Sequence, residues 1–331
     1  MTTQSNEQPN TGVDATVAAE VPVCFRHAQR ETYLRCTRCN RPICTDCMVP
    51  ASVGFHCPDC VREGNRDVKQ VRTAVGGRPQ SRPGVVTIVL ISICVVMFGL
   101  QNLIGQSFTY RMSLEAMAPS LSSLPSSSHI GVAYGFQEWY RLITCMFVHE
   151  DWIHLGTNML SLWWIGVPVE ARLGRTRYLL TFFTCGIVGS AVSFAFMSWG
   201  GDSLGASGAI FGLMGVLTVL AMREKLNMQP IITVILLNLI ISFSFAGIDW
   251  HAHLGGLGAG LLLGAALAYA PRRNVARWFA NPQNYVPTLT GVSLLVLSVV
   301  IVLIHSDHLQ NAAVASAVHT VVANLGYPQN T

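Results

Sequence analysis

The sequence predicts an all-α protein that crosses a membrane several times and carries a small cysteine-rich domain at its N-terminus. Of its 331 residues, 51% are hydrophobic and only 11% are charged, whereas soluble domains average about 25% charged residues. The departure is uneven, because the first 83 residues are polar and hold seven of the ten cysteines, while apolar segments separated by short charged loops fill the rest. Two domains follow, and only the second has the composition of a membrane protein.

Seven apolar segments are long enough, or nearly long enough, to cross a hydrocarbon core of about 30 Å. They cover residues 85–104, 153–167, 178–199, 207–222, 230–245, 252–270 and 288–304. Several are shorter than about 20 residues and contain glycine, serine, histidine or asparagine, which is typical of helices that pack against other helices. We therefore expect a helical bundle whose polar spans hold the functional site.

The distribution of lysine and arginine predicts the orientation of these spans. Positive residues precede the first span and follow the second, fourth and sixth spans: Lys69, Arg72, Arg78, Arg82, Arg172, Arg175, Arg177, Arg223, Lys225, Arg272, Arg273 and Arg277. Cytoplasmic loops carry such an excess, so we expect a plasma-membrane protein with a cytoplasmic N-terminus and an extracytoplasmic C-terminus. These residues cluster beside the spans and form no basic stripe with interleaved aromatics, so we expect no nucleic-acid binding.

Four pairs of metal ligands lie within residues 24–60, each pair separated by two residues: Cys24 and His27, Cys36 and Cys39, Cys44 and Cys47, Cys57 and Cys60. Tetrahedral zinc needs four such ligands, and one C-x2-C turn supplies two, so eight ligands predict two structural zinc ions. His56 is an alternative ligand in the last pair, and the spacing leaves open which pairs share an ion. The rival interpretation is a disulfide framework, which a reducing cytoplasm disfavours.

One arrangement of these pairs, in which the first shares an ion with the third and the second with the fourth, resembles the B-box type of zinc finger. A segment with so few apolar residues would depend on zinc for its folding. The sequence leaves the role of this domain open between binding a protein partner, self-association and regulation of the membrane domain.

Ser207 lies at the start of the fourth span, in Gly205-Ala206-Ser207-Gly208, after a loop that the orientation places outside. A run of small residues is by itself common at helix contacts in membranes. The sixth span also begins from the outer side, in Ala252-His253-Leu254-Gly255-Gly256, so Ser207 and His253 should lie at the same depth. Glycines on both spans would let the two helices approach closely, which brings a serine nucleophile within reach of a histidine base.

The second span supplies a third group of polar residues at the same side of the membrane. His154 and Asn158 are four residues apart and therefore share one helix face. Side-chain donors placed there could stabilise an oxyanion together with the backbone N–H of Ser207. His149 is expected to anchor the start of this helix. Asp249, one turn before His253, is expected to have a structural or surface role.

These motifs resemble those of the rhomboid family of intramembrane serine proteases. The resemblance rests on Gly205-Ala206-Ser207-Gly208, on Ala252-His253-Leu254-Gly255-Gly256 and on His154 with Asn158, and it extends over about residues 84–270. Tyr140-Arg141 stands where the family has Trp-Arg, and residues 170–174 match a charged turn after the second span. Phe211 occupies the position whose ring packs beside the catalytic histidine.

The resemblance implies a rhomboid-like bundle of six helices plus one and a serine endopeptidase. Ser207 would be the nucleophile and His253 the general base, with transmembrane proteins in the lipid bilayer as substrates and no cofactor in catalysis. The alternative is a non-catalytic rhomboid-like protein that binds membrane helices. A metalloprotease is disfavoured, because His149 and His154 are five residues apart and not in an H-E-x-x-H motif. A transporter is disfavoured because no paired repeats with broken helices are evident.

We therefore predict five parts along the chain. Residues 1–20 form a disordered N-terminus without the apolar core of a signal peptide, and residues 21–62 form the zinc-finger domain. Residues 63–83 form a charged, flexible linker. Residues 84–305 form the membrane domain with seven transmembrane helices, and residues 306–331 form an extracytoplasmic tail.

Overall fold

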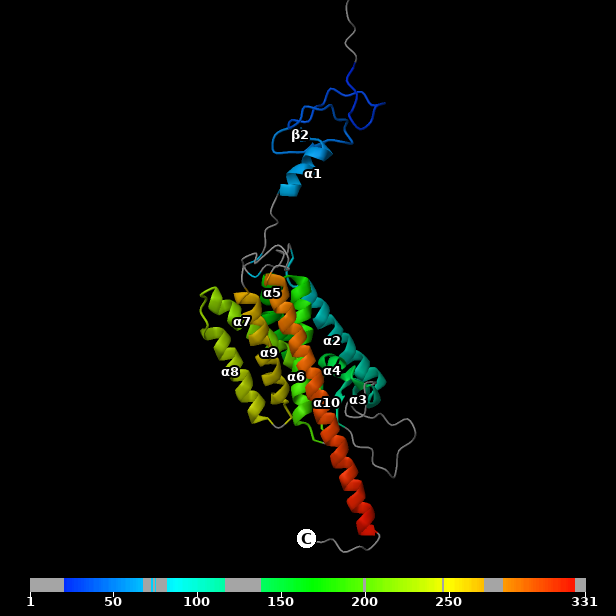
Figure 1. The fold of residues 1–331 in the computed structure, drawn as a ribbon, viewed down its shortest axis with the longest axis vertical. Helices are drawn as coiled ribbons and strands as arrows, with labels where there is room; N and C mark the ends of the chain where they lie inside the picture. The colour runs from blue at the N-terminus through cyan, green and yellow to red at the C-terminus, as the bar shows by residue number, and fades with distance from the viewer. Residues whose placement is uncertain are drawn as a thin grey trace, which may run out of the picture. The chain divides into compact units, whose positions relative to one another are not determined.

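The computed structural model describes residues 21–67, 73, 75, 82–116, 138–198, 201–245, 247–270 and 282–324. The chain divides into two compact units, Met1–Gln70 and Val71–Thr331, each considered by itself below (Figure 1). Outside the described residues lie the predicted N-terminus at 1–20, most of the predicted linker, the serine-rich segment within 117–137, the arginines at 272, 273 and 277, and the last seven residues.

The N-terminal unit is built around cysteines. Strands β1 (Val49–Pro50) and β2 (Phe55–His56) pair antiparallel and precede helix α1 (Pro58–Asp67). Its buried cluster contains one aliphatic side chain, Ile43, beside the sulfurs of six cysteines: Cys24, Cys36, Cys44, Cys47, Cys57 and Cys60. Burial of so little apolar surface cannot offset the conformational entropy lost on folding, so the unit needs another source of folding free energy.

The second unit is a helical bundle. Its elements are α2 (Val85–Ile104), α3 (Gln106–Met112), β3 (Leu114–Glu115), α4 (Arg141–Thr144), the 3-10 helix η3 (Cys145–Phe147), α5 (Trp152–Leu173), α6 (Arg175–Phe196), β4 (Asp202–Ser203), α7 (Ser207–Arg223), α8 (Gln229–Ser244), α9 (Trp250–Tyr269) and α10 (Pro282–Asn324). Among the described residues, α2, α6, α9 and α10 contain segments long and apolar enough to cross a membrane, and α7 and α8 are shorter apolar helices. The predicted all-α membrane fold is confirmed.

Two helices extend beyond the predicted spans. Helix α5 continues through Pro168 to Leu173, so Glu170 and Arg172 are helical and the predicted charged turn is wrong except for Gly174, which ends the helix. Glu170 is fully buried and accepts hydrogen bonds from the backbone N–H groups of Val86 and Thr87 at the start of α2. A carboxylate is favoured at a helix N-terminus, which explains why a charged residue continues the helix. Helix α10 ends at Asn324, well past the predicted end at 304.

Helix α7 is the centre of the bundle and is buried along most of its length. It packs against α9 through backbone contacts that only glycine permits. A Cβ atom placed on Gly256 would lie 1.9 Å from the carbonyl oxygen of Gly208, and one on Gly260 would lie 1.9 Å from that of Gly212. Small residues that allow such close backbone approach are the usual means of joining membrane helices tightly.

This contact predicts a large difference between two neighbouring glycines of α9. Gly256→Ala is expected to lower the free energy of unfolding by about 1–3 kcal/mol, because the added methyl group must push α7 and α9 apart. Gly258→Ala is the matched control, since a Cβ there has no neighbour within 4 Å. Thermal unfolding of the detergent-solubilised variants measures the difference, and equal midpoints for the two would contradict the packing described.

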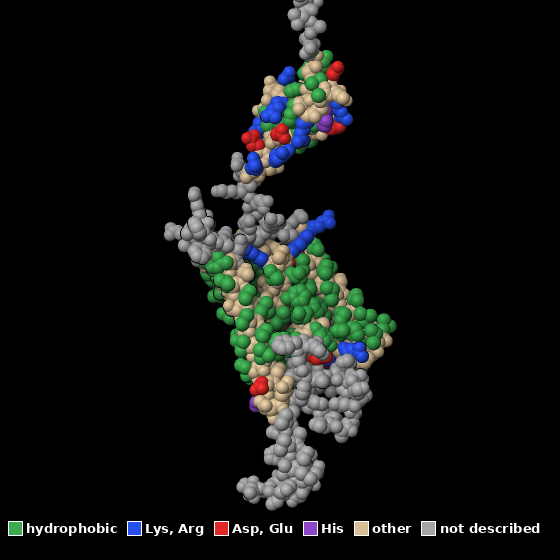
Figure 2. Space-filling model, turned by 45° about the vertical axis from the view of Figure 1, so that its right-hand side comes forward, with side chains coloured by type: hydrophobic (Ala, Val, Ile, Leu, Met, Phe, Trp, Pro, Cys, Tyr) green, Lys and Arg blue, Asp and Glu red, His purple; other side chains and the backbone are tan. Residues whose placement is uncertain are grey.

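The outer surface of the bundle suits a lipid environment. Figure 2 shows hydrophobic side chains over the visible face of the helical unit, and the charged side chains visible on this face lie toward its two ends. Helix α8 lies at one edge of the bundle and α2 at the opposite edge (Figure 1). The protein is thus a multi-pass membrane protein.

Candidate functional site

Ser207 is the first residue of α7 and follows the turn that contains Gly205 and Ala206. The N–H of Gly205 donates to the carbonyl oxygen of Cys145 at 2.8 Å, which ties this turn to η3. Gly205 has φ +118°, a conformation that side chains rarely adopt, so glycine is required there. Ser207 Oγ makes no hydrogen bond within the described part of the chain, and its hydroxyl therefore stays available for chemistry.

His253 lies in the first turn of α9, where Asp249 caps the helix. The Asp249 carboxylate accepts from the N–H groups of His251 and Ala252, each at 3.1 Å. It also accepts from the hydroxyls of Ser193 and Ser203. This network fixes the start of α9 against α6 and β4. The role of Asp249 is thus to position the helix that carries His253.

The imidazole of His253 is almost completely buried and is held on two sides. The ring of Phe211 stacks on it with a centroid distance of 4.4 Å and an interplanar angle of 13°. The Oγ of Ser242, on α8, lies 2.7 Å from its Nδ1. Sequence reasoning gave no role to Ser242. A polar residue in an apolar helix is the signal that could have drawn attention to it, but Ser244 on the same helix gives the same signal.

The backbones that carry Ser207 and His253 are in direct contact. A Cβ atom placed on Gly208 would lie 3.3 Å from the carbonyl oxygen of Ala252, and the Gly256 contact adjoins it. Phe211 follows Ser207 by one turn and reaches the His253 ring. The start of α7 and the start of α9 therefore form one site.

His154 lies on the other side of the Ser207 turn. A Cβ atom placed on Gly205 would lie 2.7 Å from His154 Nε2 and 3.9 Å from Ser207 Oγ. Asn158 is buried one turn further along α5, and its amide donates to the carbonyl oxygen of His154 at 2.9 Å. An amide nitrogen has a second hydrogen that can serve a ligand. The arrangement thus brings His154 beside Ser207, while one of the two amide hydrogens of Asn158 is used in a hydrogen bond within α5.

His149 precedes α5 and is fully buried. Gln101 of α2 donates to its carbonyl oxygen at 3.1 Å and accepts from its N–H at 3.0 Å. The His149 ring lies 5.2 Å from the ring of His154, edge to face. These contacts anchor the start of α5 and support the orientation of His154.

An ion pair links the far ends of the same helices. Arg172, near the end of α5, donates to the carboxylate of Glu224, just after α7, at 3.1 Å. Because α5 and α7 lie side by side in the same direction, their starts also lie together, which explains why His154 and Ser207 meet.

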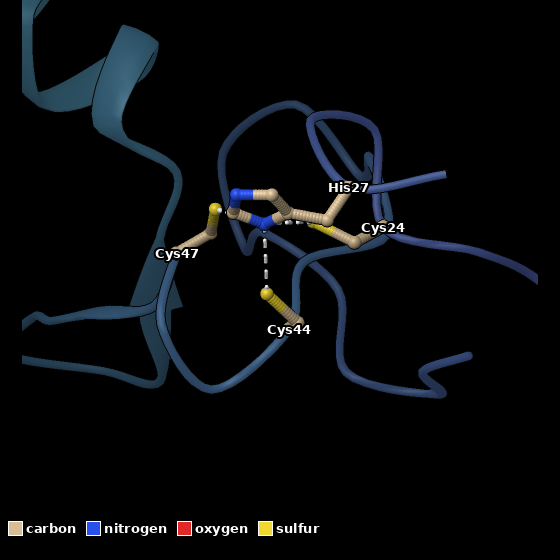
Figure 3. Close-up of side chains that lie close together, drawn as sticks. All are labelled: Cys24, His27, Cys44 and Cys47. Atoms are coloured by element: carbon tan, nitrogen blue, oxygen red, sulfur yellow. Dashed lines mark hydrogen bonds between the residues drawn. The ribbon is translucent and has the colours of Figure 1, made fainter. Parts of the chain in front are cut away.

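In the N-terminal unit, the eight predicted ligands form two clusters in the crossed arrangement. One holds Cys24, His27, Cys44 and Cys47, and the other holds Cys36, Cys39, Cys57 and Cys60. His27 Nδ1 points toward three sulfurs, at 3.3 Å from Cys44, 3.4 Å from Cys47 and 3.8 Å from Cys24 (Figure 3). The second cluster contains Cys57 and not His56.

These distances fit tetrahedral zinc. With Zn–S of about 2.3 Å and Zn–N of about 2.0 Å, ligand atoms should be about 3.5–3.8 Å apart. The Cys39 and Cys57 sulfurs of the second cluster are 3.7 Å apart. Burial alone raises the pKa of the Cys24 thiol, but N–H donors from Arg26, Cys44 and His27 outweigh this and lower the pKa to about 6. Two closed sets of four soft or borderline ligands could thus each hold a structural ion.

Comparison with known proteins gives a consistent result. A Rhomboid domain matches residues 137–270. The chain is 37% identical over 186 residues to rhomboid protease GluP from Bacillus subtilis, covering 55% of this chain and 34% of GluP. It is 34% identical over 171 residues to putative rhomboid protease YdcA from the same organism, covering 47% of this chain and 85% of YdcA. RHOMBOID-like protein 4 from Arabidopsis thaliana is 35% identical over 140 residues, covering 40% of this chain and 35% of that protein.

The chain thus spans about a third of the length of GluP and most of YdcA. The matched Rhomboid domain contains Ser207, His253, His154 and Asn158. The extensive match to YdcA, together with the Rhomboid domain over the segment that holds the site, shows that the chain belongs to the rhomboid family.

Proposed function

We propose that this chain is an intramembrane serine endopeptidase that hydrolyses peptide bonds of transmembrane proteins. The observation that carries the proposal is the contact between the starts of α7 and α9, which brings Ser207 beside the helix of His253 while His154 flanks the same turn. A serine, a histidine base and neutral hydrogen-bond donors in a buried site are the components that acyl transfer requires.

In the proposed mechanism, Ser207 Oγ attacks the carbonyl carbon of the scissile bond while His253 accepts the hydroxyl proton. The negative charge that develops on the carbonyl oxygen is stabilised by His154, Asn158 and the backbone N–H of Ser207. His253 then gives the proton to the leaving amine as the C–N bond breaks. Water, deprotonated by His253, attacks the resulting ester. As the ester C–O bond breaks, His253 gives this proton to Ser207 Oγ, which releases the new carboxyl end and free Ser207.

We also propose that residues 21–62 bind two structural zinc ions, one in each cluster, and that no metal takes part in catalysis. The donor sets are closed by four protein ligands each, which leaves no coordination position for substrate or water. The distribution of the positive residues supports a plasma-membrane protein whose N-terminus is cytoplasmic. Residues 84–305 would then be the protease domain, with the site facing the outer side and the tail extracytoplasmic.

The test is proteolysis by the purified full-length chain in lipid vesicles. A tagged single-span substrate should be cut near its outer end, and a fluorophosphonate, which acylates activated serines, should label Ser207 as identified by mass spectrometry. Cleavage should persist in a zinc chelator. Absence of both cleavage and labelling across several substrates would favour the non-catalytic rhomboid-like alternative, and loss of cleavage with the chelator would contradict a membrane domain that works independently of zinc.

A further inference from the structure

Helix α8 is exposed along almost its whole length, and all of its residues are described. Its single buried residue is Ser242, which is 3% exposed. The apolar residues Ile231, Ile235 and Leu239 pack only partly against the bundle. The most protected contact that α8 makes is therefore polar, and it goes to His253 on α9.

The hydrogen bonds of Ser242 indicate which nitrogen of His253 carries a proton. Ser242 Oγ lies 2.7 Å from the carbonyl oxygen of Asn238 and 2.7 Å from His253 Nδ1. A carbonyl oxygen only accepts, so the single hydroxyl proton goes to Asn238. The contacts to Asn238 and to His253 can then both be hydrogen bonds only if His253 Nδ1 carries a proton and donates it to Ser242 Oγ. This is the tautomer that leaves a lone pair on Nε2.

The ring is also fixed in orientation. Stacking on Phe211 at 4.4 Å sets the plane of the imidazole, and the bond to Ser242 sets its rotation within that plane. In serine proteases with a triad, a carboxylate performs this task by accepting from the Nδ1–H of the histidine, and its replacement costs activity mainly through the wrong tautomer. In the described part of this chain, no carboxylate contacts His253 Nδ1.

We propose that Ser242 is the positioning residue of the catalytic base: it accepts from Nδ1–H of His253 and keeps Nε2 free to take the proton of Ser207. The proposal rests on the proposed function, because it assigns His253 the role of base. It also links the base to α8, so that the tautomer is held only while α8 is packed against α9.

The test compares four proteins reconstituted as full-length chains in vesicles: wild type, Ser242→Ala, Ser242→Thr and Ser244→Ala. Ser244 is the matched control, because its hydroxyl donates to the carbonyl oxygen of Ile240 at 2.7 Å, as Ser242 does to Asn238, but its side chain is exposed and contacts no histidine. The measurements are kcat and KM for a transmembrane substrate, and the rate and site of fluorophosphonate labelling.

Ser242→Ala should lower kcat and the labelling rate by about 10- to 100-fold, since it would remove only part of the roughly 10²- to 10⁴-fold that positioned proton transfer contributes. KM should stay at the wild-type value, and Ser242→Thr, which keeps the hydroxyl, should restore most of kcat. Ser244→Ala should behave as wild type. A Ser242→Ala variant with the kcat of Ser244→Ala, or a Ser242→Thr variant as slow as Ser242→Ala, would overturn the role of Ser242 while leaving the proposed function intact.

Two further outcomes bear on the inference. Labelling of Ser242 itself in the wild type would show that it is a nucleophile and not an acceptor. A wild type that neither cleaves nor labels would overturn the proposed function and, with it, the role of Ser242.

Discussion

Ser207→Ala and His253→Ala are each expected to lower cleavage of a transmembrane substrate by about 10⁶-fold, the size of the loss when the nucleophile or the base of a serine protease is removed. Ser207→Ala removes the atom that forms the ester. His253→Ala leaves the hydroxyl without a proton acceptor. The measurement is the rate of substrate cleavage in vesicles, followed by the appearance of both product fragments.

The double variant gives a sharper test than either single change. Because the nucleophile and its base act as one unit, Ser207→Ala combined with His253→Ala should be no slower than the worse single variant. If the fold-losses of the two single variants multiplied in the double variant, the two residues would act separately, which would contradict a dyad.

Two substitutions on the same helices serve as controls. His251→Ala removes another histidine of α9, whose ring stacks on Phe196 and Trp250. Thr218→Ala removes a hydroxyl of α7 that donates to the carbonyl oxygen of Met214 at 2.8 Å. Both should retain cleavage near the wild-type rate. Activity that survives Ser207→Ala would show that another residue is the nucleophile.

Much of the helical fold was predictable, because the physical signal is local. Hydropathy alone placed α2 at Val85–Ile104. The same signal failed at the end of α5, where Glu170 reads as a loop residue but satisfies the N–H groups of Val86 and Thr87 on another helix. A tertiary contact of this kind leaves no trace in hydropathy.

The segment between α2 and α5 shows the same limit. Arg141 is fully buried, and its guanidinium donates to Glu138 and to the carbonyl oxygens of Tyr110 and Ser113. Tyr140, which precedes it, is 40% exposed. Adjacent residues in one motif thus have opposite environments. Only the family resemblance singled out this pair, and the partners of each residue could come only from the folded chain.

The candidate site, too, was predictable only in part. The glycine pattern around Ser207 and His253 predicted two helices in close contact, because small residues at regular spacing have a direct steric consequence. Ser242 and Ser244 are indistinguishable in sequence, and only the rotation of α8 places one on His253 and the other on the surface. The residue that sets the tautomer was therefore missed.

Removal of zinc is expected to unfold the N-terminal unit completely. Structural zinc contributes about 10–16 kcal/mol of apparent binding free energy in small domains, whereas the buried cluster of this unit contains Ile43 as its one aliphatic residue. The full-length chain should contain two zinc ions by elemental analysis. The side chains of Arg30, Arg35 and Arg38 are already exposed in the folded unit, so folding protects them from trypsin only by holding the backbone in place. A chelator should remove both ions and unfold that backbone, so that tryptic cleavage after these three arginines becomes fast.

Single substitutions should separate the two ions. Cys44→Ser should lower the zinc content from two ions to one by opening the first cluster, and Cys57→Ser should do the same through the second. Cys94→Ala is the control, because Cys94 is a buried residue of α2 outside both clusters. It should keep two ions and resist trypsin as wild type does.

The crossed pairing of the ligands predicts that the two zinc sites lose their fold together. One ion would join the first ligand pair to the third, and the other would join the second pair to the fourth. The segments that form the two sites are therefore interleaved along the chain, and neither site can fold as a separate segment. Loss of either ion should therefore unfold the backbone at both sites, so that trypsin cleaves after Arg30, near the first cluster, and after Arg38, near the second, at the same time. Protection of one arginine while the other is cut would mean that the two sites fold independently, as they would if consecutive pairs shared an ion.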